Sequence, residues 1–100
     1  QIEYILHSLI LNGIPVDKLA VHFHDTNGCA LDNIKVALEK GISVIDSSIN
    51  GLGGCPFAPG SPGNVATEKV VNMLHNMGYE TDIDTHLLEE AREYANKITI

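Results

Sequence analysis

Two short strand-like segments, separated by a helical pattern, most strongly limit the folds that this chain can adopt. The segments are LAVHFH at 19–24 and ISVIDSS at 42–48, and both are rich in β-branched or apolar residues. Strands that alternate with helices indicate parallel pairing, because the intervening helix returns the chain to the end of the sheet where the first strand began. The sequence therefore predicts that residues 19–24 and 43–47 are adjacent parallel strands.

Apolar residues spaced three and four apart predict four helices around these strands. The predicted helices cover residues 1–12, 29–40, about 66–77 and 85–97. Asn64 is a candidate cap for the third helix, because an asparagine oxygen can accept a hydrogen bond from a helix's first N–H groups. Between the second strand and the third helix, residues 49–64 are rich in glycine and proline and predict a long loop.

The two predicted strands are too few to form a complete parallel sheet. Parallel sheets are covered on both faces, and their open edges pair with further strands. We therefore expect an α/β fold in which this chain is one piece of a larger domain and packs against more polypeptide.

Composition excludes several classes of function. The chain carries 6 Lys and Arg against 13 Asp and Glu, a formal net charge of −7, which argues against nucleic acid and anionic membranes as partners. No apolar run reaches the ~18 residues of a membrane-spanning helix. Two cysteines, Cys29 and Cys55, are too few for a disulfide framework and are interpreted as free thiols in a reducing compartment.

A pair of histidines lies at the carboxyl end of the first predicted strand. His22 and His24 are two residues apart, so both side chains lie on the same face of a strand, and Asp25 follows them. Two neutral imidazoles on one face, with Asp25 following, can supply half of an octahedral divalent-metal shell, and a mixed nitrogen and oxygen shell also suits Mg²⁺. The same pattern also fits two inert, hydrogen-bonded polar residues, and the residues alone leave both interpretations open.

The glycine-rich loop GLGGCPFAPGSPGN at 51–64 matches neither of the common phosphate-binding loops. Its distinctive residue is Cys55, between Gly54 and Pro56. A loop of this composition can move and bring a thiol over a site, whereas the alternative is a surface loop with an incidental cysteine. Asn64 closes the loop and has two candidate roles, a metal ligand through its side-chain oxygen or the helix cap described above.

Three stretches carry a resemblance to a known family. HFHDTNG at 22–28, VIDSSINGLGGCPFAPGSPGN at 44–64 and VATEKVV at 65–71 resemble the 3-hydroxy-3-methylglutaryl-CoA lyases. The resemblance implies a (β/α)₈ TIM barrel. It also implies that residues 1–100 are a fragment of its single catalytic domain, namely the C-terminal part with about the last two βα units and a C-terminal helix.

The resemblance also implies an activity, the cleavage of 3-hydroxy-3-methylglutaryl-CoA to acetoacetate and acetyl-CoA, as used in leucine degradation and ketone body formation. It implies that His22, His24 and Asn64 bind a divalent metal, Mg²⁺ or Mn²⁺, and that Cys55 and His22 are catalytic. Glu68 matches a position near the site, with its role open. The expected partner is an acyl-CoA substrate, with no nucleic acid or membrane. The full-length protein is expected to be a homodimer, cytoplasmic in a bacterium and in the mitochondrial matrix of a eukaryote.

Two alternatives stay open. One is a related Claisen-type synthase or aldolase on the same barrel, although such synthases typically carry a Glu-Arg pair where this chain has Cys55 and Pro56. The other is an isolated fragment without activity of its own. By the resemblance, an aspartate metal ligand and a catalytic arginine belong to the first strand of the barrel, which is not among these residues.

Overall fold

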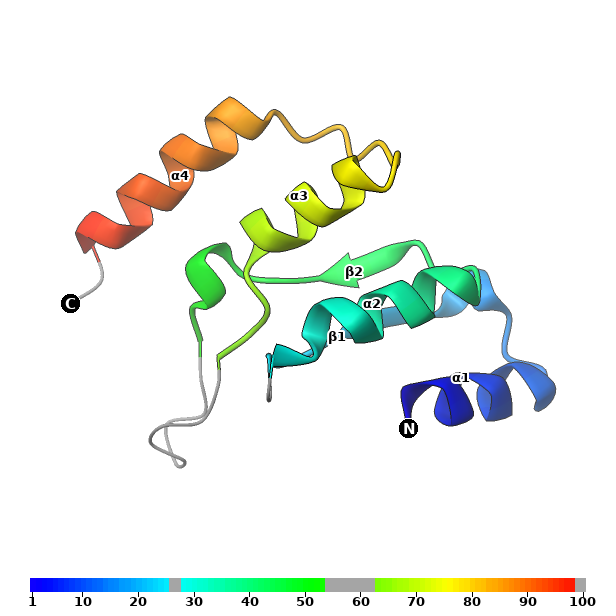
Figure 1. Cartoon of the computed structure of the whole chain (residues 1–100). Coiled ribbons are helices and arrows are strands. Elements are labelled where there is room, and N and C mark those ends of the chain that lie inside the picture. Colours follow the sequence, from blue (N-terminus) through cyan, green and yellow to red (C-terminus); the bar gives the residue numbers. More distant parts are fainter. Residues whose placement is uncertain (26–27, 54–62, 99–100) are drawn as a thin grey trace.

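The chain forms helices and two strands in the predicted order. The structure, a computed structural model, describes residues 1–25, 28–53 and 63–98 (Figure 1). Its elements are α1 (Ile2–Leu11), the 3-10 turn η1 (Val16–Lys18), β1 (Ala20–His22), α2 (Ala30–Glu39), β2 (Val44–Asp46), the 3-10 turn η3 (Ile49–Gly51), α3 (Thr67–Asn76) and α4 (Thr85–Ile98). The α/β class is therefore confirmed. The two 3-10 turns were not predicted.

The two strands form a parallel two-stranded sheet. Three pairs of residues are in register, namely Ala20 with Val44, Val21 with Ile45 and His22 with Asp46. Helix α2 connects the strands, so the predicted parallel pairing is confirmed. Both strands are shorter than predicted. After β1, His24 instead forms an isolated antiparallel bridge with Asn64, which lies on the far side of the glycine-rich loop.

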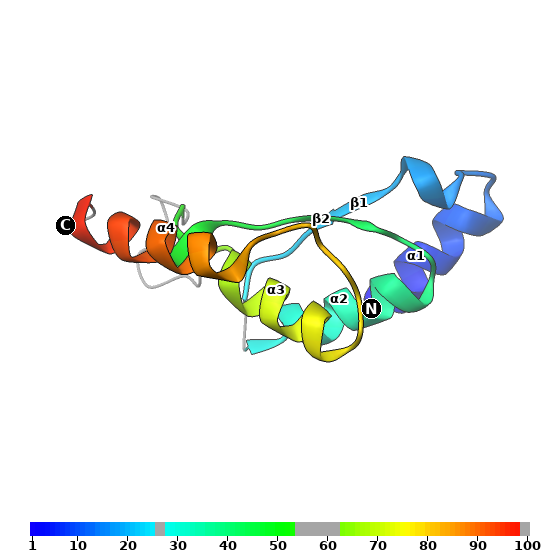
Figure 2. The same ribbon diagram turned by 90° about the horizontal axis from the view of Figure 1, so that it is seen from above.

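One face of the sheet is covered by helices and the other is open. On the covered face Val21 is buried, whereas its neighbours Ala20 and His22 are exposed. Figure 2 shows α2 and α3 on the same side of β1 and β2. The buried residues of this layer form two clusters that share contacts with Phe23 and Ile45; they are Ala30, Ile34, Val65, Val70 and Leu74 in one, and Leu6, Val21, Ala37 and Ile42 in the other.

The ends of two helices differ from expectation. Asn64 does not cap α3, because the residue before that helix is Ala66 and makes no side-chain cap bond. The side chain of Asn64 is instead used inside the loop, as described below. At the start of α4, Oδ1 of Asp84 accepts hydrogen bonds from the backbone N–H groups of His86 (2.9 Å) and Leu87 (3.2 Å). Asp84 is thus an unpredicted cap.

Helix α4 contacts the rest of the chain through α3 and η3 (Figure 1). Within the described parts of the chain, no helix is both long enough and apolar enough to cross a membrane.

Candidate metal and catalytic site

His22 and His24 lie on the open face of the sheet, at the carboxyl end of β1. Exposure alternates along this segment, with Val21 and Phe23 covered and both histidines exposed. The two imidazole centroids are 5.4 Å apart, with the ring planes at 70°. The predicted common face of the two histidines is therefore confirmed, and their rings are close enough to act on one ligand.

His22 is paired with a carboxylate on the neighbouring strand. Its Nδ1 atom lies 2.6 Å from Oδ2 of Asp46, and the two residues are register partners in the sheet. About half of the His22 side chain is exposed to solvent. A carboxylate on one ring nitrogen fixes the orientation of the imidazole and leaves the other nitrogen, Nε2, as the ligand atom.

Asn64 is brought next to His24 by the backbone. Residues 63–65 run alongside 23–25, with backbone hydrogen bonds of 3.1 Å on each side of the bridge between His24 and Asn64. The loop therefore leaves the end of β2 and returns beside the end of β1. Asn64 and the histidine pair, which are 40 residues apart in the sequence, come together at one end of the sheet.

The amide of Asn64 has a defined orientation. Its Nδ2 donates hydrogen bonds to the carbonyl oxygens of Leu52 (2.8 Å) and Gly53 (2.9 Å). Because both N–H groups are used in this way, the amide group presents its oxygen, Oδ1, on the opposite side. Asn64 thus offers an oxygen that can bind a metal, and the hydrogen bonds from its Nδ2 to Leu52 and Gly53 hold that oxygen in a fixed orientation.

These three side chains fit part of a divalent-metal shell. They offer Nε2 of His22, an imidazole nitrogen of His24 and Oδ1 of Asn64, a mixed set that suits transition metals and Mg²⁺. The carboxylate behind His22 is the usual support of a metal-binding histidine. Over residues 1–25, 28–53 and 63–98, no three His, Cys, Asp or Glu side chains form a metal-binding group. The chain therefore offers half of an octahedral shell, and the remaining ligands must come from water, substrate or other polypeptide.

The other candidate residues differ in how the structure places them. Cys55 lies in 54–62, outside the described residues, so neither its role as a catalytic thiol nor the predicted opening of its loop is tested. Oδ1 of Asp25 accepts a hydrogen bond from the N–H of Ala30 (3.3 Å), which gives it a role at the start of α2. Glu68 accepts a hydrogen bond from the backbone N–H of Asn50 (3.0 Å).

Sequence reasoning missed Asp46. The signal was present, because Asp46 follows β2 residues in the segment VIDSS and ends the second strand as His22 ends the first. In a parallel pair, the strand ends lie at the same edge, so an aspartate there is a candidate partner for the histidine. Only the register shows that the two are direct neighbours.

A model of the HMGL-like family matches residues 3–94. The chain belongs to this family. Among curated relatives, the mitochondrial hydroxymethylglutaryl-CoA lyase of Arabidopsis thaliana is 58% identical over 84 residues, which are 84% of this chain and 18% of the relative.

Solved structures of family members have the same arrangement. The HMG-CoA lyase of Brucella melitensis is 50% identical with a TM-score of 0.88, over 97% of this chain and 34% of that one. An HMG-CoA lyase from Acinetobacter baumannii, in complex with coenzyme A and 3-methylmalate, is 45% identical with a TM-score of 0.77, over 88% of this chain and 28% of that one.

The chain thus spans about a fifth to a third of the length of these family members. The comparisons support an α/β piece that is a small part of the larger fold of these lyases. They do not support the more specific placement as the C-terminal part of a barrel, because a share of length does not fix which end is matched.

Proposed function

We propose that this chain supplies part of the catalytic domain of a carbon–carbon lyase that cleaves 3-hydroxy-3-methylglutaryl-CoA to acetoacetate and acetyl-CoA. The observation that carries this proposal is the meeting of His22, His24 and Asn64 at one end of the sheet, with Asp46 behind His22. The relatives that match nearly the whole chain carry the name of this enzyme.

The chain's contribution to substrate binding is a set of fixed ligand atoms. His22, His24 and Asn64 would hold Mg²⁺ or Mn²⁺, which would supply Lewis-acid polarisation of substrate oxygens. The two histidines lie at the carboxyl end of β1, and in α/β barrels that end of the strands is where substrates bind. Asp46 keeps the His22 ring from rotating.

The reaction requires one proton to leave the tertiary hydroxyl and another to reach carbon. When the hydroxyl proton leaves, its O–H electrons form the new carbonyl of acetoacetate, and the adjacent carbon–carbon bond breaks. The electron pair of that bond remains on the acetyl-CoA carbon as an enolate. We assign the protonation of this carbon to the Cys55 thiol. His22 would act by holding the metal: with Nε2 as a metal ligand and Nδ1 on the Asp46 carboxylate, it has no nitrogen left for the hydroxyl proton, which would pass to water or to a base on further polypeptide.

The wider setting of the protein is proposed on the same basis. The substrate is an acyl-CoA, as the coenzyme A in the Acinetobacter baumannii structure suggests. The full-length protein would be a homodimer with one TIM-barrel catalytic domain per subunit. It would be cytoplasmic in a bacterium and in the mitochondrial matrix of a eukaryote, because family members include both bacterial and mitochondrial proteins.

The direct test is an assay of the full-length protein that contains this chain. Purified protein would be stripped with a chelator, reloaded with Mg²⁺ or Mn²⁺ and supplied with 3-hydroxy-3-methylglutaryl-CoA. We expect metal-dependent release of acetoacetate and acetyl-CoA in equal amounts. Residues 1–100 alone should release neither, because further ligands are required.

The assay also separates the alternatives. Condensation of acetyl-CoA with a 2-oxo acid, without cleavage of 3-hydroxy-3-methylglutaryl-CoA, would identify a synthase and contradict the proposal. Cleavage that persists at the full rate after complete chelation would contradict the metal site.

A further inference from the structure

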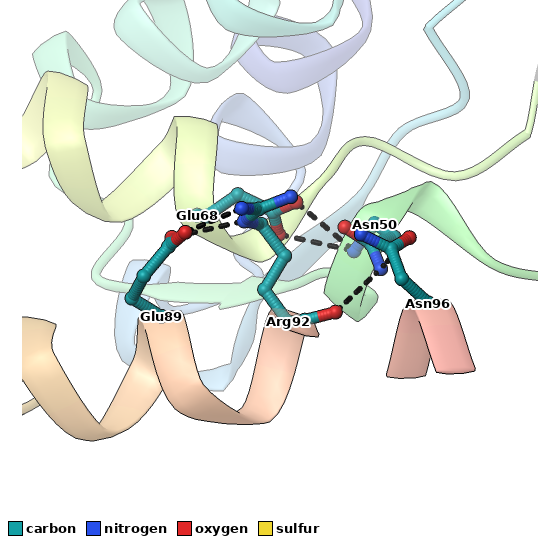
Figure 3. Close-up of polar contacts among 5 residues, drawn as sticks. All are labelled: Asn50, Glu68, Glu89, Arg92 and Asn96. Atoms are coloured by element: carbon teal, nitrogen blue, oxygen red, sulfur yellow. Dashed lines mark hydrogen bonds and ion pairs between the residues drawn. The ribbon is translucent and has the colours of Figure 1, made fainter. Parts of the chain in front are cut away.

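The carboxylate of Glu68 is hydrogen-bonded to Asn50, near the start of the loop that leads to Asn64. Both of its carboxylate oxygens accept a hydrogen bond from the backbone N–H of Asn50, at 3.0 and 3.2 Å (Figure 3). Asn50 has a left-handed conformation, with φ 54° and ψ 12°. A non-glycine residue is uncommon in this region, although asparagine adopts it more often than most, and the bonds to Glu68 in the first turn of α3 hold Asn50 there.

Helix α4 binds the side chain of Asn50. The Nδ2 atom of Asn50 donates hydrogen bonds to the backbone oxygen of Arg92 (3.1 Å) and to Oδ1 of Asn96 (3.0 Å), as Figure 3 shows. Asn50 is therefore bound through its backbone to α3 and through its side chain to α4.

The segment that starts at Asn50 leads directly to the amide of Asn64. Leu52 and Gly53 follow within three residues, and their carbonyl oxygens accept both hydrogen bonds from Nδ2 of Asn64. The backbones are in close contact here, because a Cβ atom at Gly51 would lie 2.8 Å from the Asn64 carbonyl oxygen. A shift of residues 50–53 would therefore move or release the Asn64 amide.

We propose that Glu68 is a positioning residue for Asn64. It anchors residues 50–53 through the N–H of Asn50, and the carbonyls of Leu52 and Gly53 in turn hold the amide so that Oδ1 stays directed at the metal. The proposal rests on the proposed function only in taking Asn64 as a metal ligand. It gives a role to Glu68, which the sequence left open.

The test measures Mn²⁺ affinity of the chelator-stripped full-length protein by isothermal titration calorimetry. Glu68→Ala removes both acceptors, and we expect the Mn²⁺ dissociation constant to rise about 10-fold, the lower end of the effect of outer-shell partners. Glu68→Gln loses the charge but keeps an oxygen that accepts from the N–H of Asn50, and it should restore affinity to within about threefold of wild type.

Further variants and a melting measurement separate positioning from general stability. Glu93→Ala removes an exposed carboxylate on α4 that also acts on the charge of Arg92, and it should leave the dissociation constant unchanged. If a charge opposite Arg92 were the important feature, Glu68→Gln would bind metal as weakly as Glu68→Ala, which would overturn the proposal. Thermal melting of each variant reports any loss of folding. Asn96→Ala removes one α4 contact to Asn50, and like Glu68→Ala it should raise the Mn²⁺ dissociation constant.

His24→Ala distinguishes failure of the positioning role from failure of the metal site itself. If His24→Ala weakens Mn²⁺ binding and Glu68→Ala does not, the positioning role is wrong and the metal site stands. If His24→Ala has no effect either, the metal site itself is wrong.

Discussion

Nδ1 of His22 and Oδ2 of Asp46 are 2.6 Å apart, on residues that face each other across the parallel sheet. Because the register sets this pair, the backbone of the two strands defines the orientation of the imidazole. The carboxylate occupies Nδ1 and leaves Nε2 to bind a ligand. Asp46 thereby supports the site without needing to touch the metal.

Asp46→Ala is expected to weaken metal binding about 10–100-fold, because loss of an outer-shell carboxylate frees the histidine ring to rotate. The measurement is the Mn²⁺ dissociation constant of the full-length protein by calorimetry. Asp32→Ala, an exposed carboxylate on α2, is the matched control and should bind Mn²⁺ as wild type does. Equal affinity in the Asp46 and Asp32 variants would show that the pair is only a surface contact.

Asn64→Asp tests the orientation of the amide. A carboxylate is the better metal ligand by charge, so a simple ligand role predicts tighter binding. However, an aspartate has no N–H to donate, and it would place an oxygen against the carbonyls of Leu52 and Gly53. We therefore expect Mn²⁺ affinity to fall. Affinity above wild type in the same titration would contradict the orienting role of the two carbonyls.

The sequence was sufficient for the order of elements and for the common face of the histidines, since both follow from short-range periodicity. It could not give the partners of Asn64 or Glu68. Asparagine is a common helix-capping residue, which is why the sequence predicted a cap at Asn64. The loop instead returns beside β1, and the Asn64 amide donates hydrogen bonds to the carbonyls of Leu52 and Gly53. The bonds from Asn50 to α4 span more than 40 residues and depend on how that helix packs.

Cys55→Ser in the full-length protein should lower kcat about 10²–10⁴-fold, the usual contribution of a general acid or base, because a hydroxyl holds its proton more tightly than a thiol. Steady-state kinetics across Mn²⁺ concentrations provide the measurement. Mn²⁺ affinity should not change, whereas His24→Ala should lose metal affinity and recover part of its activity at high Mn²⁺. Turnover of the Cys55 variant near the wild-type rate would make the thiol a bystander.

The ion pair on α4 predicts a pH dependence. Hydrogen bonds from Arg92, one of them 2.9 Å from Nε to Oε2, hold the pKa of Glu89 below its usual 4.5. A carboxyl whose pKa is lowered by folding stabilises the folded state above pH 4.5, and this contribution is lost as the pH falls through the lowered pKa. An NMR titration of the Glu89 carboxyl carbon should give a midpoint below 4.5 that rises in Arg92→Met. The same midpoint in both proteins would show that the pair does not form in solution.

The position of a bound metal shows directly whether His22, His24 and Asn64 form one metal site. Crystals of the full-length protein grown with Mn²⁺ would be measured near the manganese absorption edge, so that anomalous difference density locates the ion. A metal site formed by these side chains predicts one peak within about 2.0–2.3 Å of Nε2 of His22, an imidazole nitrogen of His24 and Oδ1 of Asn64. A peak elsewhere, or Nδ2 of Asn64 facing the ion, would contradict it.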